Sequence, residues 1–295
     1  TAAVVLAAVL SAIRAAGTRL RDQKIVIYGA GTAGLGIADM MRDQMVREGL
    51  SFQEATRRFY PMGSKGLLTQ DKPGLLDFQQ PYARTAADVM GWEKSDRGIG
   101  LAEVVSRVHP TILIGTSTHS GAFTEAVVRD MASHVQRPII LPLSNPTSKA
   151  EALPVDLIEW TQGRVLLATG SPFGPVTYGD HSYEIAQANN ALVFPGLGLG
   201  VVVAKASRIS DRMIAAAADA VAGMSDASRL GASLLPSMSD LRSVSAAVGA
   251  AVATAAADEG LAQAELDNLI QQIHDAMWRP EYPRIEFNWS GPAPS

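Results

Sequence analysis

Short apolar runs rich in Val, Ile and Leu alternate with segments whose apolar residues recur at helical spacing. Such runs predict buried parallel strands, because both faces of those strands are covered. The predicted strands are residues 24–28, 58–62, 111–114, 138–141, 165–168 and 191–194. The helices predicted between them are residues 32–47, 101–107, 124–134 and 155–161. This alternation indicates an α/β protein with a Rossmann-type, doubly wound parallel sheet.

Helical patterns without strands occupy both ends of the chain. An apolar helix is predicted at 2–16, closed by Gly17, and the strand signal stops after Gly200. Alanine-rich helices follow at 211–222, with Ser210 as N-cap, and at 243–257. A last helical stripe runs from 266 to 277, and residues 278–283 are predicted as an extended tail. The sheet is therefore expected to carry a C-terminal helical extension.

The first predicted strand leads into a G-x-G-x-x-G turn formed by Gly29, Gly31 and Gly34. The first glycine permits a sharp turn, the second lets a pyrophosphate approach the backbone, and the third lets the helix lie close to the strand. The phosphates would meet free N–H groups at the positive end of the helix dipole. The pattern predicts a dinucleotide site. The alternative is a purely structural turn between strand and helix.

The end of the second strand bears on the choice of cofactor. An NAD-binding unit usually places Asp or Glu there, to accept from the ribose 2′-hydroxyl. This chain has Gly63, Ser64 and Lys65 instead, and Glu54 takes a capping-box position after Ser51. A hydroxyl and an ammonium suit a 2′-phosphate, which favours NADP. The alternative is that Ser64 and Lys65 are only exposed turn residues.

Ligands of doubly wound sheets bind at the carboxyl ends of the strands. The loops expected to converge there are 29–34, 115–121, 143–147 and 169–174. Asn145, Asn189 and Asn190 are the polar candidates, because an amide binds a carboxylate, a hydroxyl or a carboxamide without adding charge. Asn145 is alternatively an Asn-Pro turn bonded to its own backbone, and Asn189 and Asn190 a loop entering the next strand.

Composition narrows the possible partners and chemistry. The 295 residues are 47% hydrophobic and 18% charged, with a net charge of −4 and no basic patch, which argues against nucleic acid and membrane partners. The absence of cysteine excludes disulfides, thiolate metal sites and a cysteine nucleophile, and fits a cytoplasmic protein. The five histidines lack metal-ligand spacing. The residues alone therefore predict a dinucleotide site without a complete catalytic set.

Several longer motifs resemble malic enzymes, and together they cover nearly the whole chain. They are GAGTAGLGIA at 29–38, PTILIG at 110–115, RPII with LSNPT between 137 and 147, ATGSPF at 168–173, NN with FPG between 189 and 196, and WRPEY at 278–282. The match is to the C-terminal NAD(P)-binding domain of that family. It implies oxidative decarboxylation of (S)-malate to pyruvate and CO2 with reduction of NAD or NADP, and a Mn or Mg ion in the full-length enzyme.

The resemblance also assigns residues to the site. Those matched to the cofactor are Thr1, Gly29, Ala30, Gly31, Thr32, Ala33, Gly34, Ser64, Lys65, Thr116, Ser117, Ser144, Asn145 and Asn189. Asn145 and Asn190 are matched to the substrate. The family's tyrosine, arginine, lysine and metal carboxylates precede the position of Thr1, so the resemblance implies no catalytic or metal residue in this chain.

We expect a fragment, because the chain starts with Thr1 rather than Met and directly in a helix. We expect it to be inactive alone, because the catalytic and metal residues implied by the resemblance precede Thr1. Its expected partners are a missing N-terminal substrate domain and further copies in a dimer or tetramer. The expected division is 1–188 as the NAD(P)-binding Rossmann domain, 189–258 as helices packing toward the substrate domain, and 259–295 as a C-terminal helix and tail. The alternatives are a malolactic enzyme, which yields lactate, and a non-catalytic dinucleotide-binding module.

Overall fold

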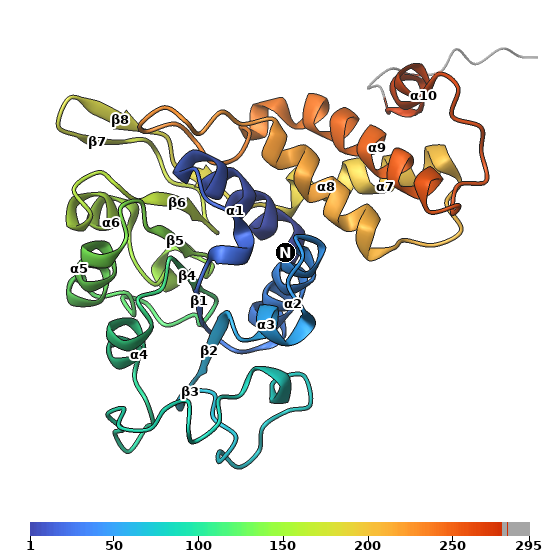
Figure 1. Cartoon of the computed structure of the whole chain (residues 1–295). Helices are drawn as coiled ribbons and strands as arrows, with labels where there is room; N and C mark the ends of the chain where they lie inside the picture. The colour runs from blue at the N-terminus through green and yellow to red at the C-terminus, as the bar shows by residue number, and fades with distance from the viewer. Residues whose placement is uncertain (279–281, 283–295) are drawn as a thin grey trace, which may run out of the picture.

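The computed structural model describes residues 1–278 and Tyr282. Seven strands form one sheet in the order β3-β2-β1-β4-β5-β6-β9 (Figure 1). The strands are β1 Ile25–Tyr28, β2 Phe59–Gly63, β3 Gly66–Leu67, β4 Ile112–Gly115, β5 Ile139–Pro142, β6 Leu166–Thr169 and β9 Ala186–Gln187. All neighbours pair in parallel except β2 and β3. This is the doubly wound α/β sheet that the sequence predicts.

Helices cover both faces of the sheet because its central strands are apolar on both sides. One face carries α1 Ala2–Ala16, α2 Thr32–Arg47 and α3 Phe52–Thr56, and the other α4 Leu101–Val108, α5 Glu125–His134 and α6 Pro154–Trp160 (Figure 1). Each face has its own hydrophobic cluster. Along β1, Ile25 and Ile27 belong to the α1 and α2 side, whereas Val26 belongs to the α4 to α6 side. The strand alternation thus builds two cores.

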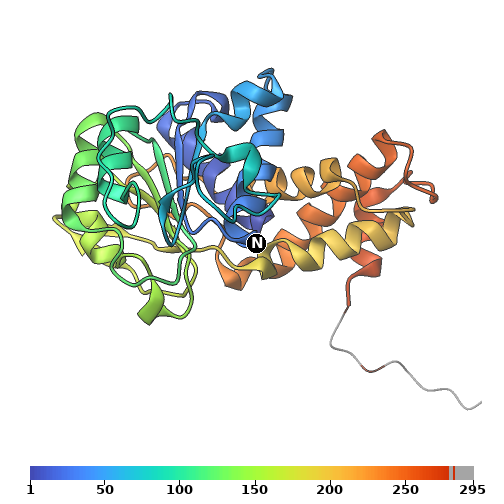
Figure 2. The same ribbon diagram turned by 90° about the horizontal axis from the view of Figure 1, so that it is seen from below.

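The remaining helices lie together beside the sheet, as the sequence predicts for a C-terminal extension (Figure 2). They are α7 Phe194–Ala204, α8 Asp211–Gly223, α9 Leu241–Asp258 and α10 Leu269–Ala276. Helix α8 packs on α1, which joins the extension to one face of the sheet. None of the described helices is long and apolar enough to cross a membrane.

Several predicted helix ends are confirmed. Gly17 closes α1 in the left-handed conformation with φ 67°. The side chain of Ser51 accepts from the backbone of Glu54 and the carboxylate of Glu54 accepts in return, so this pair is a capping box on α3. Ser210 caps α8 by accepting from the backbone of Met213. The predicted tail at 278–283 lies mostly outside the described residues.

The strand predicted at 191–194 is wrong. Asn190–Leu192 form a 3-10 turn, α7 follows directly, and the last parallel strand is Ala186–Gln187. A short run of apolar residues occurs both in buried strands and in buried helices, so the hydrophobic pattern alone does not distinguish them. The hairpin of β7 Val176–Tyr178 and β8 His181–Tyr183 was also not predicted, although Gly179 marks its turn with φ 57°.

Helix α7 is rich in glycine because it crosses α9 closely. A Cβ on Gly200 would lie 2.5 Å from the carbonyl oxygen of Gly249 and 2.7 Å from the Cβ of Val252. A Cβ on Gly196 would lie 2.5 Å from the Cβ of Val248. Gly198, on the same helix, has nothing within 4 Å of a Cβ. The glycines at 196 and 200 are therefore packing residues, and the one at 198 is not.

This contrast predicts opposite effects of one substitution at two positions. Gly200→Ala forces α7 and α9 apart and should lower the free energy of unfolding by about 1–3 kcal/mol. Gly198→Ala should raise it by up to about 1 kcal/mol, since alanine favours a helix over glycine. Urea unfolding followed by circular dichroism measures both. Equal shifts in the two variants would contradict the close crossing.

Candidate functional site

The turn between β1 and α2 packs so closely against Thr116 and its own backbone that two of its positions require glycine. Gly29 has a φ of 125°, and a Cβ there would lie 2.5 Å from the carbonyl carbon of Thr116. A Cβ on Gly34 would lie 2.1 Å from the carbonyl oxygen of Gly29. At Gly31 nothing in the described structure lies within 4 Å of a Cβ. Gly31 therefore faces open space, from which a ligand could approach the backbone.

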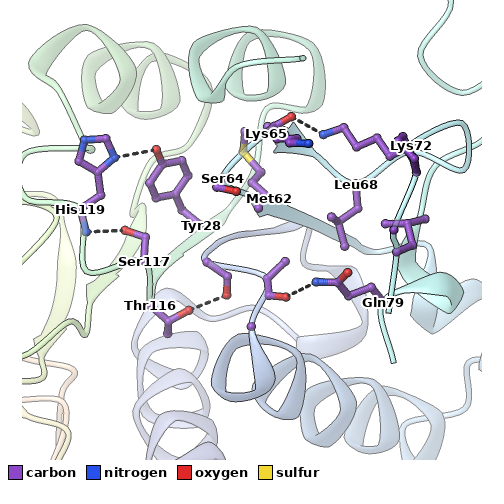
Figure 3. Close-up of a pocket in the computed structure, with 18 residues that line it drawn as sticks. Tyr28, Met62, Ser64, Lys65, Leu68, Lys72, Gln79, Thr116, Ser117 and His119 are labelled. Carbon is purple, nitrogen blue, oxygen red and sulfur yellow. Dashed lines mark hydrogen bonds between the residues drawn. The ribbon is translucent and has the colours of Figure 1, made fainter. Parts of the chain in front are cut away.

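Hydrogen bonds hold this turn from three sides. The hydroxyl of Thr116 donates to the carbonyl of Gly29 over 2.9 Å. The backbone N–H groups of Gly29 and Ala30 both donate to the carbonyl of Met62, which ties the turn to β2. The side-chain amide of Gln79 donates to the carbonyl of Ala30 over 2.7 Å (Figure 3). The protein itself thus fixes the conformation of the turn.

Helix α2 begins at this turn without a side-chain cap. Its N-cap residue is Gly31, and its first turn holds no acidic side chain. Thr32 and Ala33, the first helical residues, are exposed. The N–H groups of a first turn have no acceptor within the helix and carry the positive end of the helix dipole. Groups of this kind are suited to binding a phosphate or pyrophosphate.

A cavity of about 550 Å³ opens over this turn (Figure 3). The cofactor residues predicted from the sequence that line it are Gly29, Ala30, Gly31, Ser64, Lys65, Thr116 and Ser117. The lining residues that the sequence analysis missed include Tyr28, Met62, Leu68, Lys72, Gln79 and His119. The predicted residues Thr32, Ala33, Gly34, Ser144, Asn145 and Asn189 support the surrounding loops or lie beyond this lining.

Among the described residues that line the β2 end of the cavity, two are lysines and none is a carboxylate. Ser64 and Lys65 are exposed in the turn between β2 and β3, after Gly63. The ammonium of Lys72 donates to the carbonyl of Lys65 and, over 2.7 Å, to that of Leu67, which holds the turn from behind (Figure 3). Burial lowers the pKa of Lys72 below its ordinary value. No sequence pattern predicts the role of Lys72, because its hydrogen-bond partners are backbone carbonyls, which every residue has.

Tyr28 and His119 form the opposite end of the cavity. The phenol oxygen of Tyr28 lies 3.4 Å from Nδ1 of His119 (Figure 3). The Tyr28 ring also packs edge-on against Phe123. Tyr28 is the last residue of β1 and His119 lies in the loop after β4. Both residues could therefore have been predicted as site residues, because each lies at or after the carboxyl end of a strand.

Glu151 is a fully buried carboxylate that joins two of the loops. Its Oε1 accepts from the backbone N–H of Ser117 over 2.8 Å, from the Ser117 hydroxyl over 2.9 Å and from the Ser144 hydroxyl over 2.5 Å. A Cβ on Gly115 would lie 2.4 Å from the carboxyl carbon of Glu151. Several hydrogen bonds to one charged oxygen compensate for its burial.

Asn145 binds a neighbouring loop rather than its own backbone. Its Oδ1 accepts from the hydroxyl of Ser171 over 2.6 Å, and the peptide bond to Pro146 is cis. The side chain is exposed, so its amide NH2 remains available at the surface. The alternative of a self-bonded Asn-Pro turn does not hold in this structure.

The predicted convergence of the four loops is confirmed. Thr116 links 115–121 to the glycine turn, the N–H of Thr118 donates to the Ser144 hydroxyl over 2.8 Å, and Ser171 reaches Asn145. The carboxyl edge of the sheet is therefore one hydrogen-bonded unit.

Thr1 and Asn190 line a different, mostly apolar cavity of about 570 Å³ at the N-terminus of α7. The other residues around it include Val4, Val193, Phe194 and Leu197. Asn189 does not line it, because its Oδ1 accepts from the N–H of Ala191 and caps the 3-10 turn. The predicted site residues thus fall into two cavities.

Among the described residues, no group of three or more His, Asp or Glu side chains is arranged to hold a metal ion. The Mn or Mg ion implied by the resemblance therefore finds no fitting ligand set in residues 1–278.

The role of Glu151 predicts a stability change that depends on its charge. Glu151→Gln keeps the shape and one acceptor oxygen, but it replaces Oε2, which accepts from the N–H of Ser144, by an NH2 that faces this donor. It also removes the charge that strengthens the bonds to the other oxygen, and should lower the free energy of unfolding by about 2 kcal/mol. Glu159→Gln, on the exposed face of α6, should change it by less than about 0.5 kcal/mol. Urea unfolding measures both variants. A matching small change at Glu151 would show that the carboxylate does not hold the loops.

Comparison with known proteins places these observations in a family. Residues 1–257 match the family model described as malic enzyme, NAD binding domain. The chain is 56% identical over 287 residues to NAD-dependent malic enzyme 3 of Bacillus subtilis, covering 97% of this chain and 51% of that protein. It is 48% identical to a putative malate oxidoreductase [NAD] of Mycobacterium tuberculosis, covering 96% and 51%. The chain thus spans about half the length of the curated relatives it matches.

Solved structures show the same fold. The malic enzyme of Entamoeba histolytica superposes with a TM-score of 0.69 at 23% identity, covering 93% of this chain and 50% of that one. The malic enzyme of Pyrococcus horikoshii superposes with a TM-score of 0.68 at 25% identity, covering 93% and 57%. The match of the family model, the identity to curated relatives and the glycine turn agree, and the chain belongs to the malic enzyme family through its NAD-binding domain.

Proposed function

We propose that this chain is the dinucleotide-binding portion of a malic enzyme that oxidises and decarboxylates (S)-malate to pyruvate and CO2 with reduction of NAD. The family match and the names of relatives at 46–56% identity support the reaction. The observation that carries the cofactor role is the open face of Gly31 over the uncapped start of α2.

The proposed placement of the cofactor follows the lining of the cavity. The pyrophosphate lies over Gly31 on the first turn of α2, because that is where free N–H groups meet open space. The adenosine half extends toward Ser64 and Lys65 on one side and Thr116 and Ser117 on the other. The nicotinamide half points toward Asn145, whose amide NH2 is exposed.

The substrate side is proposed to form where this chain meets the rest of the enzyme. Thr1 and Asn190 line an apolar cavity on the same chain, away from the glycine turn. Acid–base groups and metal ligands are proposed to come from the half of the relatives' length that this chain does not span. We accordingly propose that the chain alone binds a dinucleotide without turning over malate.

NAD is proposed as the cofactor, although the sequence alone favours NADP. Relatives that match nearly the whole of this chain are named NAD-dependent malic enzymes or a putative malate oxidoreductase [NAD]. Lys65 is exposed, so water screens its charge, and a single exposed ammonium contributes little to the binding of a 2′-phosphate. No contact among residues 1–278 favours the malolactic reaction, which yields lactate, over the malic enzyme reaction, which releases pyruvate.

A glycine pair tests the cofactor role. Gly31→Ala places a methyl group where the pyrophosphate would lie and should weaken NAD binding by about tenfold or more. Because alanine is a poorer N-cap than glycine, it should lower the free energy of unfolding by no more than about 1 kcal/mol. Gly36→Ala, on the same helix and also with nothing within 4 Å of its Cβ, should leave the affinity within about twofold. Isothermal titration calorimetry measures both. Equal affinities in the two variants would sink the proposal that the turn binds pyrophosphate.

Titration with both cofactors tests the choice between them. We expect the chain to bind NAD more tightly than NADP. Lys65→Asp should weaken NADP binding by about tenfold, through repulsion of the 2′-phosphate, and change NAD binding by less than about twofold. The same calorimeter measures all four affinities. Tighter binding of NADP to the unsubstituted chain would overturn the assignment of NAD and support the 2′-phosphate reading of Ser64 and Lys65.

A further inference from the structure

Arg84 is a buried cation outside the dinucleotide cavity. Its residue is only 7% exposed, and its guanidinium carbon lies 3.8 Å from the centre of the Tyr60 ring. Nη2 donates to the carbonyls of Arg57 and Phe59 over 2.6 and 2.7 Å. Nε has no hydrogen-bond partner among the described residues. The side chain is therefore fixed in place with part of its donor capacity unused.

Among the described residues, no carboxylate forms an ion pair with Arg84, although the charge of Asp88 acts on it from a greater distance. Two acids stand nearby, and both are engaged elsewhere: Glu54 accepts from Ser51 in the capping box, and Asp88 accepts from the N–H of Thr85 and pairs with Arg57 at 3.6 Å. Burial lowers the pKa of Arg84. A buried cation without an anion is unfavourable, and an anion from solution would relieve that cost.

Arg84 lines a cavity of about 830 Å³ between α3 and the segment 81–88. The residues around this cavity, here called the Arg84 cavity, include Glu54, Arg57, Tyr82, Arg84, Thr85 and Asp88. Arg57 stands at the rim with 69% of its side chain exposed. The buried Arg84 and the exposed Arg57 thus both line the Arg84 cavity, and neither lines the dinucleotide cavity.

The backbone around Arg84 is held rigidly. Its N–H donates to the carbonyl of Leu68 and its carbonyl accepts from the N–H of Gln70, so the residue bridges to Thr69 beside the sheet. The neighbouring Tyr82 donates its hydroxyl to Asp39 on α2 over 2.8 Å. A guanidinium held in this way loses little conformational freedom when it binds a ligand, which favours binding.

We propose that the Arg84 cavity is a second ligand site, which binds a small oxyanion through Arg84 at its base and Arg57 at its rim. A carboxylate and a phosphate share the oxygen acceptors that a guanidinium recognises. The site goes beyond the proposed malic enzyme function, because it is separate from the residues assigned to the dinucleotide and to malate.

Calorimetric titration of the chain with inorganic phosphate, and separately with malonate, tests this proposal. We expect saturable binding of at least one ion, and the tighter one identifies the chemistry as phosphate or carboxylate. Arg57→Ala should weaken that binding by about fivefold or more, and Arg58→Ala, the same charge change outside the cavity lining, by less than about twofold. Asp88→Asn removes a competing carboxylate and should strengthen the binding.

The two substitutions are expected to change the anion affinity in opposite directions, whereas loss of folding would weaken binding in both variants. Circular dichroism checks that each variant is folded. Absence of saturable binding of both ions overturns the proposal. Binding that Arg57→Ala leaves unchanged and NAD displaces would place the ion on the glycine turn, which also overturns it. Failure of NAD to bind, with the Arg57 and Asp88 effects intact, would count against the dinucleotide role and not against this site.

Discussion

The close meeting of Gly29, Gly34 and Thr116 is the constraint on which the rest of the site depends. A Cβ at either glycine would fall within 3 Å of Thr116 atoms, and at Gly34 it would also strike the carbonyl of Gly29. Helix α2 can therefore start directly above β1, with its N-cap residue Gly31 on the lining of the cavity. A wider turn would move the start of α2 away from the strand ends, and the open space at Gly31 would no longer lie over the helix dipole.

A second constraint extends this arrangement across the sheet. The buried carboxylate of Glu151 gathers Ser117 and Ser144, and Ser171 in turn bonds Asn145. The loops that carry the proposed cofactor contacts are thus positioned by one another. Preorganised groups lose less freedom on binding, which fits a chain whose site is largely formed without its proposed partner domain. The apolar cavity with Thr1 and Asn190 is the part that this network does not reach.

The sequence predicted what local pattern and elementary chemistry determine. The parallel doubly wound sheet, the glycine turn, the capping box of Ser51 and the convergence of loops follow from periodicity and from the rules of parallel sheets. The strand at 191–194 was wrong because an apolar run does not reveal whether it is buried in a sheet or, as in α7, against another helix. Gln79 and Lys72 were missed because they act on backbone carbonyls across irregular loops. The sequence does not encode such contacts in any spacing.

The central claim is that the carboxyl edge of the sheet, built around the glycine turn, binds the dinucleotide in this chain alone. Amide hydrogen exchange of the chain with and without NAD tests it most directly, because it locates the ligand on the backbone. The account predicts slower exchange on NAD addition at 29–34 and 116–119, with the helices α7 to α9 unchanged. Exchange unchanged at the glycine turn, or slowed only in α7 to α9, would contradict it.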